Sequence, residues 1–324
     1  MKFFFNKILL IGFLVTGSLV ANAQPTYPDK PVTFIVPFPA GGGTDVGARL
    51  VAQKLSVKWR QSVIVDNKGG AGGLVGGELA SRAKPDGYTI FIGNVGTQAI
   101  NQYLYKKMPY DSDKAFTPIC MATELPYVLL ASPKFPPKTI RELVVLAKAE
   151  PKKITVASSG NGGGPHISME MLQGLAGIQL LHVPYKGGGP AATDLMASHV
   201  DLLFASVLES YGSIKTGAVK GIAVTTLTRS PALPELPTIS ESGIPGFDTS
   251  SWVGLFAPAG TPKNIIDKIA GDVKEVIADP EVRQTLISQG ATPTYLNPKE
   301  FKDRIASDQR RYSKLIKETG IQLE

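Results

Sequence analysis

Short apolar runs alternate with amphipathic segments along most of the chain. The runs are rich in β-branched or aromatic residues and are bounded by glycine, proline or asparagine, which is typical of strands. We expect strands at residues 32–36, 62–66, 88–92, 127–131, 154–157, 179–183, 200–204, 220–225 and 252–257. Helical patterns lie between them, for example at residues 44–58, 73–83, 139–148 and 190–198. This alternation predicts an α/β protein with mostly parallel sheets.

The two ends of the chain follow other patterns. Residues 262–278, 281–289 and 298–319 are helical throughout. At the start, Lys2 and Lys7 precede an apolar run at residues 8–20, which is shorter than the roughly 20 residues that span a bilayer. Ala21-Asn-Ala23 then provides a small-x-small cleavage site. We therefore expect residues 1–23 to be a signal peptide that is cleaved after Ala23, and the mature protein to be periplasmic.

The length of the mature chain predicts two lobes. About 300 residues usually form more than one domain. Two punctuated stretches, near residues 117–126 and 228–237, could carry the chain between lobes, and the second contains three prolines. We expect residues 24–122 and 230–324 to form lobe 1, and residues 123–229 to form lobe 2.

Charge and reactive residues exclude several functions. The formal net charge is +7, which favours anionic ligands, but no basic-aromatic cluster of the kind that binds nucleic acid is present. Cys120 is the only cysteine, and the histidines His166, His182 and His199 are too dispersed for a metal motif. We therefore expect no metal and no cofactor.

The most informative pattern is a glycine loop that occurs twice. In the first copy, strand 32–36 leads through Pro37-Phe-Pro-Ala-Gly-Gly-Gly43 into a helix that opens with Thr44-Asp45. In the second, strand 154–157 leads through Ser158-Ser-Gly-Asn-Gly-Gly-Gly164 into a helix that opens with Pro165-His166. A strand, a glycine loop and a helix N-terminus together form an anion site, because exposed N–H groups and the helix dipole both attract negative charge. One loop in each lobe would grip a carboxylate from two sides.

This pattern gives a set of candidate ligand-binding residues, with alternatives. Glycines can serve tight turns alone, Asp45 can simply complement the helix dipole, and Tyr185 and Lys186 can be solvated loop residues. A hydrolase that uses Ser158 or Ser159 with His166 is a further alternative, although no Gly-x-Ser-x-Gly motif occurs. Residues 67–73 are also rich in glycine, and we expect a structural turn there. The candidates are Phe38, Pro39, Ala40, Gly41, Gly42, Thr44, Asp45, Gly96, Thr97, Ser158, Ser159, Gly160, Asn161, Gly162, Gly163, His166, Tyr185 and Lys186.

Motifs along the whole mature chain are similar to one family. They are Tyr27-Pro-x-Lys-Pro31, Pro37-Phe-Pro-Ala-Gly-Gly-Gly-Thr-Asp45, Lys84-Pro-Asp-Gly-Tyr88, Ser158-Ser-Gly-Asn-Gly162, Val183-Pro-Tyr-Lys-Gly187, Arg229-Ser-Pro-Ala-Leu-Pro234 and Gly254-Leu-Phe-Ala-Pro-Ala-Gly260. In this set and order they resemble the tripartite tricarboxylate transporter solute-binding family, the Bug-type periplasmic receptors. The resemblance implies a two-lobed type II periplasmic-binding fold and no enzymatic activity.

The resemblance also implies a ligand and partners. The ligand would be a small organic carboxylate, a di- or tricarboxylate of aliphatic or aromatic type, gripped by both glycine loops. A monomeric receptor would deliver it to the membrane permease subunits of a tripartite transporter, or alternatively present it to a sensor domain. Many relatives have Asp-Asn where Ala205-Ser206 stands after strand 200–204, and this pair joins the candidate ligand-binding residues. Loss of that acidic group makes a ligand ammonium group less expected.

Overall fold

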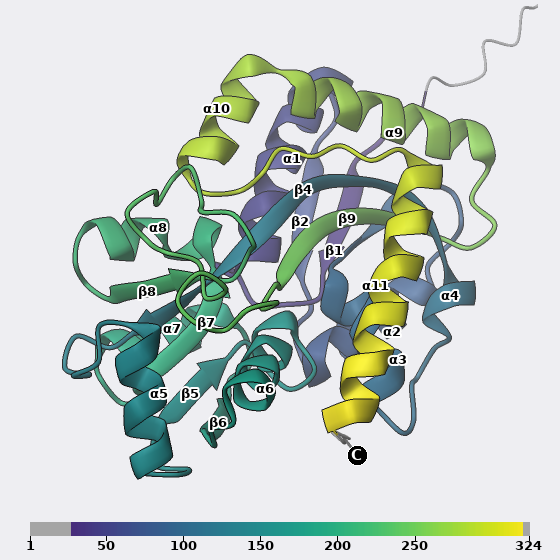
Figure 1. Cartoon of the computed structure of the whole chain (residues 1–324). Coiled ribbons are helices and arrows are strands. Elements are labelled where there is room, and N and C mark those ends of the chain that lie inside the picture. The colour runs from purple at the N-terminus through teal and green to yellow at the C-terminus, as the bar shows by residue number, and fades with distance from the viewer. Residues whose placement is uncertain (1–26, 320–324) are drawn as a thin grey trace, which may run out of the picture.

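The strands of the protein form two sheets that share one long strand. The computed structural model describes residues 27–319, so the expected signal peptide lies outside the described residues. The hydrogen-bonded strand order is β2-β1-β3-β9-β4-β7-β5-β6, with β8 on the other side of β4 (Figure 1). We call the β2-β1-β3-β9 side the first sheet and the β7-β5-β6 side, with β8, the second sheet.

The first sheet is built from both ends of the chain. Its strands β1, β2 and β3 are parallel, and β9 joins β3 antiparallel. The strands are β1 (Val32–Val36), β2 (Val63–Asn67), β3 (Thr89–Gly93) and β9 (Ser250–Pro258). The helical segments on this side are α1 (Gly43–Trp59), the 3₁₀ turn η1 (Ala71–Gly73), α2 (Leu74–Ser81), the π-helical turn η2 (Gly96–Ile100), α3 (Asn101–Leu104), α4 (Ser112–Ala115), α9 (Lys263–Ala278), α10 (Pro280–Ser288) and α11 (Pro298–Thr319).

The second sheet uses the middle of the chain. β5 pairs in parallel with β6 and β7, while β7 and β8 pair antiparallel with β4. The strands are β5 (Thr155–Ser158), β6 (Leu181–Pro184), β7 (Leu202–Ser206) and β8 (Lys220–Val224). The helices are α5 (Ile140–Ala149), α6 (Gly164–Ala176), α7 (Gly188–Met196) and α8 (Val207–Lys215).

Amphipathic helices cover both sheets and give each its own core. On the first sheet, α1 buries Val51 and Leu55 against the strands and against α9. On the second, Leu143 of α5 and Leu172 of α6 pack against Phe204 of β7. Burial of such side chains is the main favourable contribution to folding.

The long strand β4 (Phe116–Ala131) connects the two sheets. Its first part pairs with β9 as far as Pro126, and from Tyr127 onward it pairs with β7 and β8. The stretch at residues 117–126, where we expected an irregular crossing between lobes, is instead part of this extended strand. Pro118, which has no N–H group to donate, is tolerated there because the pairing register shifts next to it. The expected crossing at 228–237 lies in the irregular segment between β8 and β9. The lobe boundaries given above stay a prediction.

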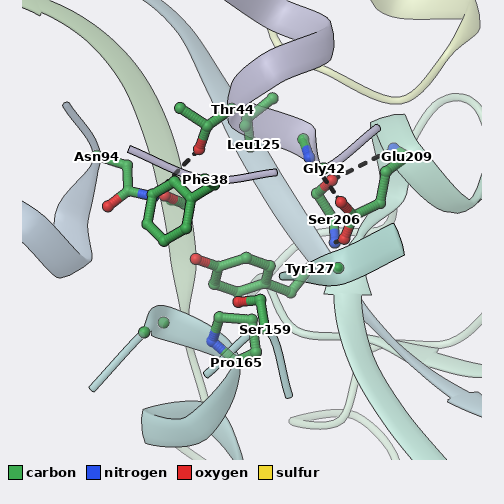
Figure 2. Close-up of a pocket in the computed structure, with 15 residues that line it drawn as sticks. Phe38, Gly42, Thr44, Asn94, Leu125, Tyr127, Ser159, Pro165, Ser206 and Glu209 are labelled. Atoms are coloured by element: carbon green, nitrogen blue, oxygen red, sulfur yellow. Dashed lines mark hydrogen bonds between the residues drawn. The ribbon is translucent and has the colours of Figure 1, made fainter. Parts of the chain in front are cut away.

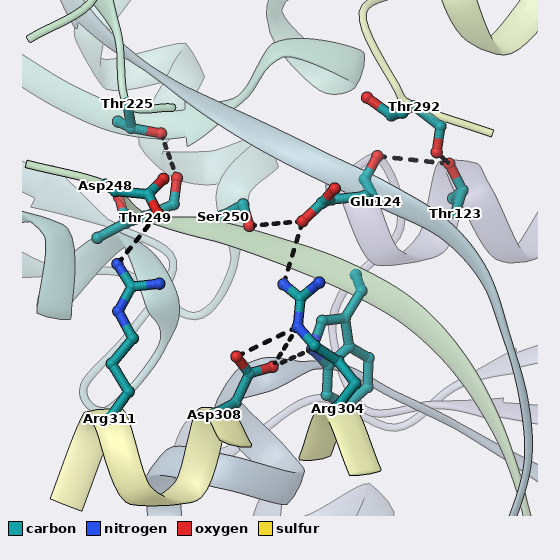
Figure 3. Close-up of polar contacts among 11 residues, drawn as sticks. Thr123, Glu124, Thr225, Asp248, Thr249, Ser250, Thr292, Arg304, Asp308 and Arg311 are labelled. Atoms are coloured by element: carbon teal, nitrogen blue, oxygen red, sulfur yellow. Dashed lines mark hydrogen bonds and ion pairs between the residues drawn. The ribbon is translucent and has the colours of Figure 1, made fainter. Parts of the chain in front are cut away.

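Polar contacts fasten the C-terminal helix α11 to the strands that run between the sheets (Figure 3). Arg304 donates to Glu124 Oε1 of β4 at 3.1 Å, and Ser250 of β9 donates to the same oxygen at 3.0 Å. Asp308 accepts from the Trp252 indole at 3.0 Å and pairs with Arg304. These contacts tie three segments that are far apart in the sequence.

Most sequence-predicted elements are present with small shifts at their ends. The features that were not predicted include helix α8, the short helix α4 and the part of β4 that precedes Tyr127. Cys120 of β4 is fully buried, and burial raises the pKa of its thiol, so it is a core residue. Within residues 27–319, no helix has both the length and the apolar character needed to cross a bilayer.

Candidate functional site

A small cavity lies between the two sheets, where helices from both begin (Figure 2). Its volume is about 40 Å³. The N-terminus of α1, on the side of the first sheet, and the N-termini of α6, α7 and α8, on the side of the second sheet, contribute residues to its lining. The lining residues are Phe38, Gly42, Gly43, Thr44, Asn94, Leu125, Tyr127, Ser159, Gly163, Gly164, Pro165, Gly188, Ser206, Glu209 and Ser251.

The first glycine loop delivers the N-terminus of α1 to this cavity. Its N-cap, Gly42, makes no side-chain capping bond, so the first-turn N–H groups have no side-chain cap of their own. Asp45 is turned away, is 2% exposed, and accepts from Gly41 N at 2.9 Å, Arg49 Nε at 3.0 Å and Asn67 Nδ2 at 2.8 Å. Burial favours the neutral carboxyl, but these donors outweigh it and lower the pKa of Asp45. Asp45 thus holds the loop in place from behind.

The second glycine loop delivers the N-terminus of α6, whose N-cap Gly163 also lacks a side-chain bond. Here the support is a pair of stacked imidazoles: His166 and His182 lie 4.1 Å apart with nearly parallel rings. His166 Nδ1 accepts from Gly162 N at 3.2 Å, and His182 Nε2 lies 2.7 Å from Ser158 Oγ. Burial and the neighbouring His166 lower the pKa of His182 to about 3, so the stack is held by a neutral ring.

A third loop forms the side of the cavity. Asn94 donates from Nδ2 to Thr44 Oγ1 at 3.1 Å, and its Oδ1 accepts from Thr97 N at 3.1 Å. Thr97 and Asn94 therefore form a closed turn in which Asn94 is the residue that reaches the cavity. Gly96 packs close to Gly163 of the second loop.

A second, larger cavity adjoins the first and shares Phe38 and Ser159 with it. Its volume is about 210 Å³. The turn expected to be only structural, residues 67–73, contributes Gly70 to Gly73 to its wall, and Lys186 lines it from the loop before α7. The remaining lining residues are Tyr105, Gly160, Asn161, Pro184 and Tyr185.

The structure thus separates the sequence-predicted site residues into three groups. Those that line the first cavity are Phe38, Gly42, Thr44, Ser159, Gly163 and Ser206. Those that line only the second are Gly160, Asn161, Tyr185 and Lys186. Those that line neither are Pro39, Ala40, Gly41, Asp45, Gly96, Thr97, Ser158, Gly162, His166 and Ala205. Ligand contacts by any of these residues stay a prediction.

Sequence reasoning missed four lining side chains that carry polar groups: Asn94, Tyr127, Glu209 and Ser251. Ser251 is 3% exposed, and its hydroxyl has no hydrogen-bond partner among the described residues. Glu209 had a signal, since Ser206-Val-Leu-Glu209 is a capping box, in which the first and fourth residues bond each other's backbone N–H groups. That pattern predicts the start of α8. In such a box the Glu209 side chain folds back to Ser206, the last residue of β7.

The hydrolase alternative finds no support in this geometry. Ser158 is 1% exposed, lines neither cavity, and has His182 rather than His166 as its partner. Ser159 lines both cavities, but His166 lines neither, and its Nδ1 already accepts from Gly162 N. With a pKa of about 3, His182 is too weak a base to activate a hydroxyl at neutral pH. Across residues 27–319, no group of three histidine, cysteine or acidic side chains is placed to hold a metal ion.

The sequence from residue 47 to residue 321 matches the family model described as the tripartite tricarboxylate transporter family receptor. The chain belongs to this receptor family. Its members are solute-binding proteins of the periplasm, and the family is not enzymatic.

Solved structures agree with this assignment. The periplasmic binding protein BugD is 37% identical, with a TM-score of 0.86 over 92% of this chain and 100% of BugD. Rpa4515 of R. palustris with adipate is 33% identical, with a TM-score of 0.89 over 91% and 99% of the two chains. MatC of Rhodopseudomonas palustris with bound malate is 32% identical, with a TM-score of 0.84 over 90% and 100%. The expected α/β periplasmic-binding-protein fold and Bug-type resemblance are confirmed.

Proposed function

We propose that this receptor binds a small organic dicarboxylate in the periplasm and delivers it to the permease subunits of a tripartite transporter. The observation that supports this most directly is the convergence on one cavity of two helix N-termini, α1 and α6, whose N-cap glycines make no side-chain capping bond. Each presents N–H groups and a positive helix end, which together favour an anion. The buried Ser251 hydroxyl in the cavity lining provides a further polar contact.

Two adjoining cavities suit a ligand with two acidic ends. One carboxylate would lie in the first cavity between the helix ends, and the carbon chain would pass Phe38 and Ser159, which both cavities share. The second carboxylate would then reach the second cavity, where Lys186 supplies a positive charge. The dicarboxylates bound by Rpa4515 and MatC, adipate and malate, have this general form.

Delivery in the periplasm requires export. We propose that residues 1–23 are removed after Ala23, as the sequence pattern predicts. N-terminal sequencing of the protein recovered from the periplasm would locate the cleavage site.

A ligand screen tests the proposal. Thermal shifts are measured with adipate, malate, tricarboxylates and monocarboxylates, and hits are followed by calorimetry. A true ligand stabilises the folded protein by RT ln(1 + [L]/Kd), about 2.7 kcal/mol at one hundred times Kd. We expect a dicarboxylate to give the largest shift. The absence of a shift with every carboxylate would contradict the proposed function.

A pair of charge variants tests the placement of the second carboxylate. Lys186→Gln should weaken dicarboxylate binding by about tenfold, roughly the strength of one charge-assisted contact, and leave monocarboxylate binding almost unchanged. Lys148→Gln, the same change at an exposed position on α5, is the control and should have no effect. Equal losses of affinity for mono- and dicarboxylates in Lys186→Gln would contradict a contact between Lys186 and the second carboxylate.

A further inference from the structure

Glu209 reaches across the cavity from the second sheet to the first. It is the third residue of α8, and its Oε1 accepts from Ser206 N at 2.9 Å within the capping box. Its other oxygen, Oε2, accepts from Gly43 N, at the start of α1, at 2.6 Å. Figure 2 shows the carboxylate between Gly42 and Ser206 at the edge of the cavity. A carboxylate of the protein itself therefore already uses one of the amides that an anionic ligand would seek.

The groups around this carboxylate provide no positive side chain. From α7, the backbone of Gly188 comes so close that a β-carbon there would lie 2.7 Å from Oε2. From β4, the cavity is faced by Leu125 and by Tyr127, the one other titratable side chain of the lining, whose pKa burial raises. The described lining includes no lysine, arginine or histidine.

The nearest charged groups on neighbouring elements point elsewhere. On α1, Asp45 is paired with Arg49 and turned away from the cavity. Before α7, Lys186 lines the second cavity only. Desolvation therefore dominates at Glu209 and, against the two backbone hydrogen bonds from Ser206 and Gly43, raises its pKa to about 7.

A bound carboxylate would lie beside this group in a site with little water. Two carboxylates in such proximity do not both stay ionised, because their repulsion raises the proton affinity of one of them. We propose that Glu209 is a specificity-determining residue that takes up one proton from solvent for each carboxylate bound, and then donates a hydrogen bond to that carboxylate. The inference rests on the proposed function and adds to it the coupling between ligand and proton.

Ionised Glu209 could instead pair with a ligand ammonium group, but the surroundings oppose a cation. Both carboxylate oxygens already accept a backbone N–H. In addition, the N-termini of α1, α6, α7 and α8 all reach the cavity lining, and their positive ends disfavour a second positive charge. A protonated carboxyl keeps both backbone contacts and adds a donor where the ligand needs one.

The experiment compares Glu209→Gln with wild type. Glutamine keeps one acceptor oxygen for the capping-box contact with Ser206 N and carries a permanent donor, like the protonated acid. Its amide nitrogen cannot accept from Gly43 N, so the variant releases that amide for the ligand. The control is Glu142→Gln, because Glu142 is a first-turn glutamate of α5 that also bonds the backbone before its helix, far from the cavity. Adipate and malate are both used as probes between pH 6.5 and 8.5, where their own carboxyls are ionised. Calorimetry in two cationic buffers with different ionisation enthalpies, triethanolamine and Tris, gives the number of protons taken up without adding an anion that competes for the site.

Wild type and Glu142→Gln should take up about one proton at pH 8 and lose affinity about tenfold per pH unit above 7. Glu209→Gln should take up none, show no such slope, and bind at least tenfold more tightly than wild type at pH 8.5. The inference is overturned if wild type binds without proton uptake, if Glu209→Gln keeps the slope, or if it binds more weakly at every pH.

The number of protons taken up is measured on the wild-type protein. The inference can therefore be tested even if Glu209→Gln folds poorly. If a dicarboxylate binds without proton linkage, the proposed function stands and this inference fails. If no dicarboxylate binds at any pH, the proposed function fails and the inference with it.

Discussion

The two glycine loops share a sequence pattern and a position at the end of a strand, yet different chemistry supports them. The first loop is held by a buried ionised carboxylate, Asp45, which collects donors from Gly41, Arg49 and Asn67. The second is held by two stacked imidazoles, of which His182 is neutral and bonds Ser158. Both loops lead into a helix whose N-cap glycine makes no side-chain bond, and both helices begin at the same cavity. The backbone arrangement at the cavity is thus repeated, while the support behind it is not.

This difference shows which parts of a repeated motif the function demands. An anion needs exposed N–H groups, so both loops keep glycines at the surface of the cavity. The residues behind the loop only have to satisfy buried polar atoms, and a charge network or an imidazole stack can do so. The two supports respond differently to packing changes and to acid.

The largest expected effects come from adding one methyl group to the first residue of each helix. A β-carbon at Gly43 would collide with the Ser206 side chain across the cavity, whereas one at Gly164 would collide with the Tyr127 hydroxyl of the adjoining strand. Gly43→Ala should reduce ligand affinity at least tenfold and lower the free energy of unfolding by about 1 kcal/mol, because the displaced Ser206 side chain caps α8. Gly164→Ala should lower that free energy more than Gly43→Ala does, by up to about 3 kcal/mol, as overpacking does. Calorimetry and urea unfolding separate the two outcomes, and equal stability losses would contradict the contrast.

Acid should distinguish the two supports by a smaller amount. An unfolded histidine titrates near pH 6.5, while native His182 titrates near 3. Between these values the unfolded chain binds a proton that the native state does not, so stability falls as pH drops, by at most about 1.4 kcal/mol per unit. Asp45 has a lowered pKa, so its contribution is present above the unfolded value near 3.9 and is lost only below it.

Urea unfolding of His182→Gln, Asp45→Asn and wild type between pH 7 and pH 4.5 measures this distinction. From pH 7 to pH 4.5, the free energy of unfolding of His182→Gln should fall less than that of wild type. The free energy of unfolding of Asp45→Asn should be lower than that of wild type at every pH and should fall by the same amount. Other titrating groups are common to all three proteins and cancel in the differences. A His182→Gln profile as steep as that of wild type would show that the stack does not set the acid response.

The smallest expected effect comes from replacing a glycine that lies outside both glycine loops. Gly174 lies in α6, the same helix that starts at Gly164, and no atom lies within 4 Å of a β-carbon placed there. Gly174→Ala should raise the free energy of unfolding by roughly 0.5–1 kcal/mol, because alanine loses less entropy in a helix. Ligand affinity should not change. A loss of stability or affinity would mean that open space around a glycine does not identify it as dispensable.

Sequence reasoning located the loops better than the side chains within the site. Strand ends, glycines and helix starts follow from local pattern, and Phe38, Gly42 and Ser159 do line the cavity as expected. Ser158 and Ser159 are neighbours of the same type, and only the path of the chain turns one toward His182 and the other toward the cavity. Glu209 had a local signal in its capping box, but nothing local revealed that its carboxylate meets Gly43, 166 positions earlier.

The sequence by itself determined the alternation of strands and helices, the position of the two glycine loops and the family, because these depend on local spacing and on motifs read in order. The tertiary structure alone decided which residues face the cavity, what holds each loop from behind, and that a protein carboxylate stands among the helix ends. Those features arise from contacts between segments distant in the chain, and burial at such contacts sets hydrogen-bond partners and proton affinity in ways that local pattern does not encode.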